Sequence, residues 1–296
     1  MNKEWREYIM KICCNKVILI IFLFVSVAFV SCEKTQPKQK IKPANITVLL
    51  DLSNRIDNGQ SERDLKVLNN FKDWFYRRQK ENFFETNDKL KVLFHPQITQ
   101  DIIPNIDDLQ NNLIYDLSVN NIIQKTEVKK TLKQMRDSVW NYSLFEIYKK
   151  SLYLGKTSKW LGSDIHGFFD HDVDNYAICD SCKNILIILT DGYLNYIPTH
   201  NSKSPSVESN WFEKDVLDRF PNFALINTRK QNSKALDNLK ILVLEVNKDN
   251  NQFDKIEKIL TDWFVSMGIK ENNIKILPTD LPANTKQVIE NFLNND

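Results

Sequence analysis

Oxygen-bearing side chains follow two apolar runs of this sequence, and their types suit metal binding. Asp51 and Ser53 come directly after an apolar run at 46–50, and Asp191 follows a second run at 184–189. Carboxylate and hydroxyl oxygens are hard ligands for Mg²⁺ or a similar ion, with water and a partner's oxygen completing an octahedron. A carboxylate at a buried strand end is costly unless it is paired, hydrogen-bonded or metal-bound. The sequence therefore predicts a divalent-metal site at Asp51, Ser53 and Asp191.

Strand-like runs that alternate with helical patterns predict the elements that bring these residues together. We expect strands at 46–50, 90–94, 184–189, 239–246 and 274–277, and helices at 61–79, 254–267 and 285–293. Ser61 is expected to cap the first helix and Gly268 to stop the second. This alternation indicates an α/β fold, with a doubly wound, mostly parallel sheet and helices on both faces. Ligands of such sheets bind outside the carboxyl ends of the strands, where both aspartates would lie.

Residues 98–150 have a weaker pattern and are predicted to form a helical insertion. The region is rich in aromatic side chains, which we expect to pack in the core rather than to form a ligand cage. They include Trp140, Tyr142, Phe145, Tyr148 and, just beyond, Tyr153.

The order of these motifs resembles that of the von Willebrand factor A domain, a Rossmann-like fold. That family places Asp-x-Ser-x-Ser after its first strand, a Thr in a loop, and an Asp in a (Thr/Ser)-Asp-Gly setting after its fourth strand. Asp51 and Ser53 match the first motif, Asp191 matches the last, and Ser163 of Gly-Ser-Asp-Ile stands in place of the loop Thr, with Thr157 as the alternative. The resemblance spans roughly 45–295, apart from the insertion. It implies a metal-ion-dependent adhesion site with Mg²⁺ (or Mn²⁺ or Ca²⁺), completed by an acidic side chain of a protein partner.

Position 55 departs from this family pattern, because Arg55 stands where the third hydroxyl is expected. A guanidinium group cannot ligate a cation and would repel it at close range. Three arrangements are open. Arg55 pairs with Asp57 or Asp164 away from the metal, or it faces an acidic partner directly, or the site is degenerate and metal-free.

Residues 1–32 are expected to be a lipoprotein signal peptide. Two lysines precede an apolar run at 17–30, which is short for a membrane span of about 20 residues. Ser31-Cys32 at its end resembles the lipobox of bacterial lipoproteins, which implies cleavage before Cys32 and its lipidation. The alternative is an uncleaved anchor helix beginning near Ile12.

A polar stretch at 33–44 is expected to be a flexible tether that leads to the domain at 45–296. Its charge is basic rather than acidic, which favours a domain in the cell envelope that faces the periplasm. The whole chain has 40 basic and 38 acidic residues and a formal charge of +2, so nucleic acid is not an expected partner.

The remaining cysteines of the expected mature chain are Cys179 and Cys182. In an oxidising compartment they are expected to form a local disulfide. The alternatives are a zinc site with His166 and His171, or a redox-active pair. His95 is expected to be an isolated surface residue.

The sequence favours a binding module over an enzyme. Glycine occurs only six times, and there is no glycine-rich phosphate loop. One alternative is a structural lipoprotein with a degenerate site. The other is a metal-dependent hydrolase or phosphatase that uses Asp51, although Ser53 stands where such a phosphatase has a second acid.

Overall fold

The computed structural model describes residues 41–53, 55–82, 86–95, 102–118, 126, 138–156, 162–194, 236–247 and 249–294. Residues 42–296 form one compact unit. The leader with Cys32 and the alternative ligand Thr157 lie outside the described residues. None of the helices within the described ranges has the length and apolar character needed to cross a membrane.

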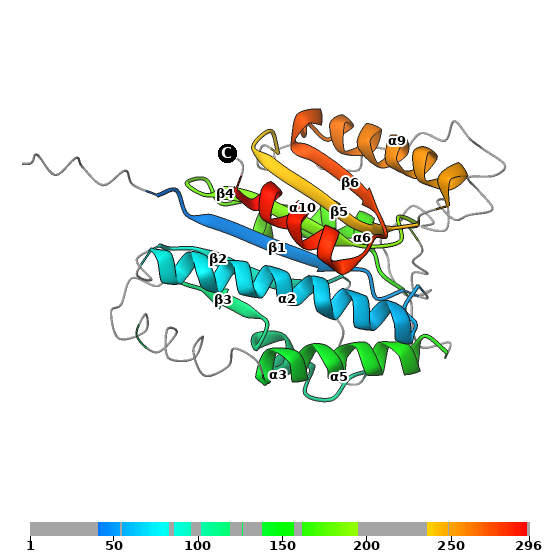
Figure 1. Ribbon diagram of the computed structural model, residues 1–296, viewed down its shortest axis with the longest axis horizontal. Coiled ribbons are helices and arrows are strands. Elements are labelled where there is room, and N and C mark those ends of the chain that lie inside the picture. The colour runs from blue at the N-terminus through cyan, green and yellow to red at the C-terminus, as the bar shows by residue number, and fades with distance from the viewer. Residues whose placement is uncertain are drawn as a thin grey trace, which may run out of the picture. The chain divides into compact units, whose positions relative to one another are not determined.

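A six-stranded sheet forms the centre of the fold (Figure 1). It is mostly parallel, as predicted, and has one strand more than the five expected. Its strands are β1 (Ala44–Leu50), β2 (Lys89–Phe94), β3 (Ile114–Asp116), β4 (Lys183–Leu189), β5 (Leu239–Val246) and β6 (Ile274–Pro278). Their order is β3-β2-β1-β4-β5-β6. Only β3 runs antiparallel to its neighbour. The chain leaves β1 toward one edge of the sheet and later returns to β4 on the other side, so strand order reverses between β1 and β4.

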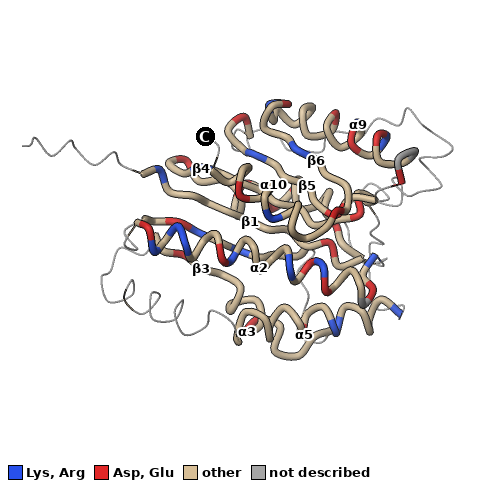
Figure 2. Tube along the Cα trace, viewed as in Figure 1, with Lys and Arg blue, Asp and Glu red and all other residues tan. Residues whose placement is uncertain are grey.

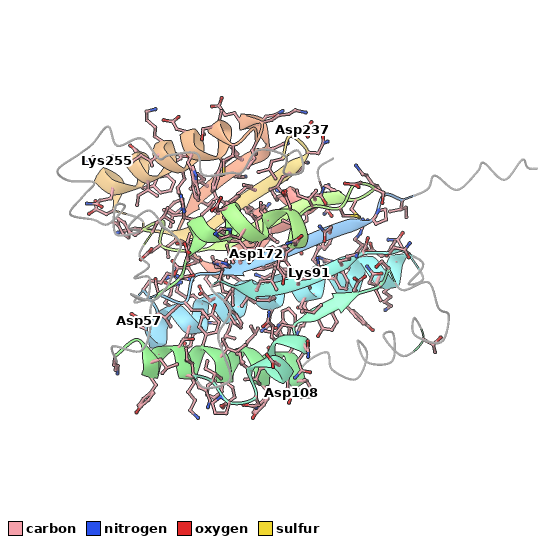
Figure 3. The ribbon with its side chains drawn as sticks, turned by 180° about the vertical axis from the view of Figure 1, so that it is seen from behind. Asp57, Lys91, Asp108, Asp172, Asp237 and Lys255 are labelled. Carbon is pink, nitrogen blue, oxygen red and sulfur yellow. A yellow bond between two sulfur atoms is a disulfide. The ribbon has the colours of Figure 1, made fainter. Side chains whose placement is uncertain are left out.

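Helices lie on both faces of the sheet (Figures 1 and 3). The helical elements are α2 (Asn58–Glu81), α3 (Ile106–Asn111), α5 (Val139–Leu154), α6 (Ile165–Gly167), η1 (Phe168–Asp172), α7 (Val173–Tyr176), α9 (Asn250–Ser266), η3 (Glu271–Asn273) and α10 (Pro282–Asn294). Side chains of α2, α3, α5 and α10 share one core with the sheet. Those of α6, η1, α7 and α9 form a second core on the opposite face.

The two central strands are buried on both faces because their sequences are apolar almost throughout. Every residue of β1 is buried, and so is every residue of β4 after Lys183. Alternate side chains of β1 enter the two different cores: Val48 packs on the α2 side and Leu49 on the α9 side. This continuous burial is typical of a parallel sheet that is covered on both faces.

Helix boundaries follow local capping chemistry. Gly268 has a φ of +95° just beyond α9, as expected for a helix stop. The prediction that Ser61 caps the first helix is wrong. Asp57 is the cap, because its carboxylate accepts a hydrogen bond from the Gln60 amide at 2.6 Å, and α2 therefore begins at Asn58.

The predicted insertion at 98–150 contributes a strand as well as helices. Its strand β3 pairs with β2 and extends the sheet at one edge. The expectation that its aromatic residues pack in the core is correct for Trp140 and Tyr148, which are buried. It is wrong for Tyr142, Phe145 and Tyr153, which are exposed on the outer face of α5.

Candidate strand-end site

The carboxyl ends of β1 and β4 lie side by side and carry the two predicted aspartates. The strands are parallel and in register from Ala44 with Lys183 to Leu50 with Leu189. The Asp51 amide continues the ladder by donating to the Leu189 carbonyl at 2.9 Å. Residues 51 and 191 therefore leave the sheet at the same edge, as expected for a switch point in a parallel sheet.

Asp51 is held in a fixed orientation by its neighbours. It is buried, with 1% of its surface exposed. One carboxylate oxygen accepts from the Ser53 amide at 3.0 Å, and the other accepts from the Thr190 hydroxyl at 2.7 Å. Thr190 belongs to the Thr-Asp-Gly sequence at 190–192, which by itself predicts no contact with Asp51. Its hydroxyl joins the ends of β4 and β1.

Asp191 lies in surroundings that disfavour its charged form. It is half-buried, and one of its oxygens accepts from the Tyr193 amide at 3.0 Å. Burial, followed by the negative charge of Asp51, raises the pKa of Asp191 to about 7, although Arg55 and the hydrogen bond from Tyr193 act in the opposite direction. A cation beside the two aspartates would oppose this shift.

Ser163 reaches the same edge from the loop before α6. It is buried, and its hydroxyl lies 3.3 Å from the Leu50 carbonyl and 3.4 Å from the His95 carbonyl. The structure thus places Asp51, Ser53, Asp191 and Ser163 around the ends of neighbouring strands. Hydroxyl oxygens keep lone pairs when they donate a hydrogen bond, so Ser163 retains acceptor capacity.

The loop that carries Ser163 is fixed against the end of β2. The Asp164 amide donates to the His95 carbonyl at 2.7 Å, and the Asp164 carboxylate caps α6 by accepting from the Gly167 amide at 2.7 Å. His95 is not an isolated surface residue, because its ring lies 3.2 Å from the Asp172 carboxylate. That expectation is therefore wrong.

Arg55 lies beneath the two strand ends with its side chain only 3% exposed. Its Nε donates to the Asp51 carbonyl at 3.0 Å and lies 3.7 Å from an Asp51 carboxylate oxygen. Its Nη2 donates to Asp64 at 2.6 Å and to the Leu189 carbonyl at 2.9 Å. Burial would lower the pKa of Arg55, but the carboxylates of Asp64 and Asp51 outweigh it and raise that pKa, so Arg55 is a permanent cation.

This position overturns two of the arrangements expected for Arg55. Pairing with Asp57 or Asp164 is wrong, because the guanidinium group contacts Asp64 and Asp51 instead. Direct contact with a partner is also wrong, because the guanidinium group points into the protein. Its shortest contact with a carboxylate is to Asp64, and no sequence pattern distinguishes Asp64 from the other acids of the first helix.

Asp64 and Glu245 extend the site into a buried polar network. Asp64 accepts from the Tyr148 hydroxyl and from the Gln60 amide group, both at 2.8 Å. Burial, followed by Asp64, raises the pKa of Tyr148 well above its usual value, so the hydroxyl stays a donor. Glu245 accepts from Gln60 at 3.3 Å and from Arg63 at 3.2 Å.

The charges of this network do not balance. Its members are the four carboxylates of Asp51, Asp64, Asp191 and Glu245 and the two guanidinium groups of Arg55 and Arg63. With all four carboxylates ionised, the formal charge of this network is −2, and burial raises the pKa of both Asp191 and Glu245. Nowhere in the described ranges do three His, Cys, Asp or Glu side chains form a cluster able to hold a metal. A cation at this edge must therefore use hydroxyl oxygens and water besides the aspartates.

The residues present fit a hard divalent cation in donor type and in charge. Asp51, Ser53, Ser163 and Asp191 supply oxygens only, and one such ion would offset the formal charge of −2 that the network has when all four carboxylates are ionised.

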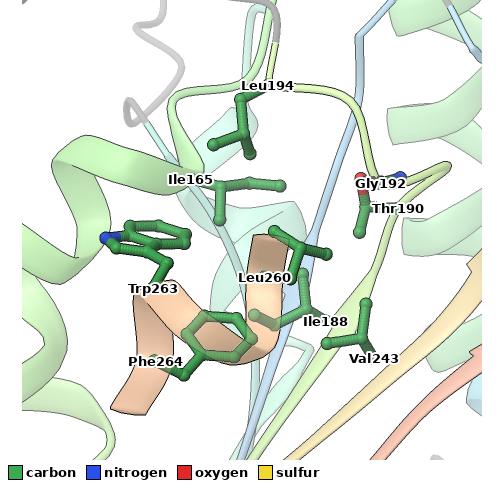
Figure 4. A pocket seen from close by; sticks show the side chains of 9 residues that line it. All are labelled: Ile165, Ile188, Thr190, Gly192, Leu194, Val243, Leu260, Trp263 and Phe264. Atoms are coloured by element: carbon green, nitrogen blue, oxygen red, sulfur yellow. Dashed lines mark hydrogen bonds between the residues drawn. The ribbon is translucent and has the colours of Figure 1, made fainter. Parts of the chain in front are cut away.

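A small apolar cavity lies behind Thr190 and Gly192 (Figure 4). Its volume is about 10 Å³, and Ile188, Leu260 and Trp263 are among the side chains that line it. This volume is at the lower limit for one water molecule, and the lining offers few polar partners for it. The cavity is therefore too small and too apolar to be a ligand site.

The cysteine pair lies at the opposite end of the sheet. Cys179 and Cys182 form a disulfide in the turn before β4, with their Cα atoms 5.3 Å apart. The alternative zinc site is not formed. His166 stacks on Trp263, and His171 lies beside Asp170.

No family model, curated protein or solved structure matches this chain.

Proposed function

We propose that this chain is a cell-envelope lipoprotein with a von Willebrand factor A-like domain that binds a protein partner through a divalent cation at the ends of β1 and β4. The observation that carries the proposal is the pair Asp51 and Asp191, whose negative charge is only partly balanced by Arg55. The mostly parallel sheet and the position of Ser163 near this pair support the same proposal.

Four side chains would hold the cation: Asp51, Ser53, Ser163 and Asp191. The ion would supply an electropositive point that attracts an acidic side chain of the partner. The protein's own part is to fix the ligands. Thr190 and the Ser53 amide orient Asp51, and the Tyr193 amide orients Asp191. Arg55 supplies buried positive charge where the family pattern has a third hydroxyl.

Arg55 also favours a second candidate, a structural lipoprotein with a metal-free site. Its Nε lies 3.7 Å from the Asp51 carboxylate, so it already neutralises part of the site. In that case Asp191 would remain protonated near neutral pH and would need no ion.

Membrane attachment is the second half of the proposal. The apolar run at 17–30, the Ser31-Cys32 pair and the polar stretch at 33–44 support a lipid anchor at Cys32 in a membrane of the cell envelope, with the domain facing the periplasm. Substitution Cys32→Ala in the full chain is expected to abolish incorporation of radiolabelled palmitate. Unchanged labelling would contradict the anchor.

Thermal melting of residues 42–296 with Mg²⁺, Mn²⁺, Ca²⁺ or chelator tests the cation site. An ion that binds only the folded state at one hundred times its Kd adds about 2.7 kcal/mol of stability. For a domain of this size, that raises Tm by roughly 5–11 °C. Asp191→Asn is expected to remove the shift, whereas Asp262→Asn, on an exposed carboxylate of α9, is expected to keep it. A Tm that is equal in Mg²⁺ and in chelator would support the metal-free candidate instead.

A further inference from the structure

The outer face of α5 exposes three large aromatic side chains. Tyr142, Phe145 and Tyr153 have 56%, 52% and 72% of their surface exposed. At about 100° and 1.5 Å per residue, they share one side of the helix and extend over about 16 Å. We call these three residues the aromatic face of α5.

The opposite side of α5 packs into the core, and the three aromatic residues take no part in that packing. Trp140, Leu144, Ile147 and Tyr148 are buried there, where α5 packs against α2 and α3. Figure 1 shows α5 along the lower edge of the described elements, with α2 above it. Within the described ranges, the aromatic face therefore has no packing role that would explain it.

Lysines accompany this face. Lys149 lies among the three aromatic residues, with its Nζ 5.8 Å from the centre of the Phe145 ring and 3.7 Å from the Glu146 carboxylate. Lys150 and Lys156 follow, and Figure 2 shows the basic positions of α5 toward its C-terminal end. Lysines exceed acids on this part of the helix. Aromatic rings flanked by lysines are the composition of helices that lie in the headgroup region of anionic membranes.

The short stretch between Cys32 and the domain limits how far the domain can lie from an anchoring membrane. The stretch 33–41 between Cys32 and the domain has nine residues and spans at most about 30 Å when fully extended. It ends at Ile41, which is 48% exposed. A bilayer anchor at Cys32, or at the apolar run itself, keeps the domain within that distance of lipid. Tethering at this range makes a weak surface contact effective.

We propose that the aromatic face of α5 rests in the headgroup region of an anionic bilayer. This inference depends on the membrane-attachment half of the proposed function and is independent of the cation site. Tyr142, Phe145 and Tyr153 would enter the interface, while Lys149 and Lys156 would contact lipid phosphates.

Vesicle co-sedimentation of residues 42–296 tests this proposal, because that fragment lacks Cys32 and forms one compact unit with two cores of its own. We expect it to bind vesicles of phosphatidylglycerol and phosphatidylethanolamine more tightly than vesicles of phosphatidylcholine. The triple variant Tyr142→Ser, Phe145→Ser, Tyr153→Ser is expected to weaken this binding by roughly tenfold or more, because three large side chains no longer enter the interface.

The matched control is Val265→Ser with Leu281→Ser, which removes exposed apolar side chains on α9 and before α10. Its vesicle binding is expected to equal that of the parent fragment. All variants are compared by circular dichroism and Tm, so that a folding defect is seen directly. The measurements are made in chelator, so a failed cation site leaves them unaffected, and palmitate labelling of the full chain tests the anchor separately.

Three results would overturn the proposal. One is absence of vesicle binding by the parent fragment, and another is equal binding by the triple variant. The third is a dimer, seen by light scattering, that the triple variant abolishes while vesicles stay unbound. That result would assign the aromatic face to a second copy of the chain.

Discussion

Arg55 sets the charge of the strand-end site. It is surrounded by Asp51 and Asp64 and by the Leu189 carbonyl, and it is almost fully buried. Removing one partner of a buried ion pair leaves an uncompensated charge, which costs more than the pair contributes. Its role therefore differs from that of Arg77, whose side chain on α2 is exposed.

Substitution Arg55→Ser is expected to lower the free energy of unfolding in chelator by about 3–5 kcal/mol, because Asp51 and Asp64 lose their buried cation. The new hydroxyl also completes an Asp-x-Ser-x-Ser sequence at 51–55, so Mg²⁺ is expected to bind more tightly than to the parent and to recover part of the loss. Urea denaturation with and without Mg²⁺ measures both effects. The control is Arg77→Ser, whose ion pair with Glu290 is exposed and contributes less than about 1 kcal/mol. Equal stability of the Arg55→Ser variant and the parent in chelator would contradict this prediction.

Asp191 makes the site sensitive to pH. Its pKa of about 7 in the folded chain exceeds the value of about 3.9 in an unfolded chain. Between these values the folded chain holds a proton that the unfolded chain has released. Its contribution to stability therefore falls as pH rises from about 4 to about 7, and is constant above that range.

Two measurements follow from this titration. The unfolding free energy of the parent, relative to that of Asp191→Asn, is expected to fall as pH rises from about 4 to about 7. Above pH 7 this difference is expected to stay constant. Mg²⁺ requires the ionised carboxylate, so its effect on Tm is expected to be larger at pH 8 than at pH 6. An equal effect at the two pH values would show that Asp191 does not ligate the ion.

At the scale of elements, the long apolar strands could be predicted from the sequence because both their faces are buried. The strand β3 was missed, since it has three residues and is too short to show a period. The first helix begins after its cap, Asp57. Ser61, four positions later, is an equally suitable cap by residue type, so the sequence alone does not decide between them. Element type thus follows from periodicity, whereas boundaries depend on which side chain makes the cap.

The site could be predicted only in part. Asp51, Ser53, Ser163 and Asp191 meet at one edge because parallel strands bring their carboxyl ends together. The orientation of Arg55 depends on Asp64 from α2 and, through it, on Tyr148 from α5. These contacts join residues 9 and 84 positions apart, and no local pattern encodes them.

Gly192, just after β4 and Asp191, has a backbone conformation that favours glycine. Its φ is +91°, and a Cβ atom would lie 2.6 Å from Ile256 Cγ2 and 3.1 Å from Val246 Cγ1. Substitution Gly192→Ala is expected to cost more than about 2 kcal/mol, since backbone strain adds to overpacking against α9. The control Gly268→Ala has a similar φ of +95° but no atom within 4 Å, so it is expected to cost only about 1 kcal/mol. Chemical denaturation compares the two, and equal losses would mean that packing against α9 contributes nothing.

At the scale of the whole molecule, the sheet has two chemically different ends. The strand ends at 51 and 191 carry the polar network, while the opposite end carries the disulfide turn and receives the chain from residue 42. The Lys183 amide after the disulfide donates to the Pro43 carbonyl at 2.7 Å, which ties this turn to the start of β1.

Replacing both Cys179 and Cys182 by Ser is expected to lower the unfolding free energy by about 2 kcal/mol, because the disulfide closes only a short loop. The Mg²⁺-dependent rise in Tm is expected to be unchanged, since the cysteines lie at the other end of the sheet. A variant that loses the Mg²⁺ response while remaining folded would show that the two ends are coupled.

The position of β1 between β2 and β4 has a mechanical consequence. This strand of seven residues, about 23 Å long, leads directly to Asp51, and under the proposed membrane attachment it follows the anchored N-terminal stretch. A partner that pulls on the site against the membrane anchor would apply tension along β1, parallel to the strand axis. The covalent backbone of β1 would carry the part of the force that enters at Asp51, whereas the part that enters at Asp191 would cross from β4 to β1 and load the hydrogen-bond ladder between them in shear.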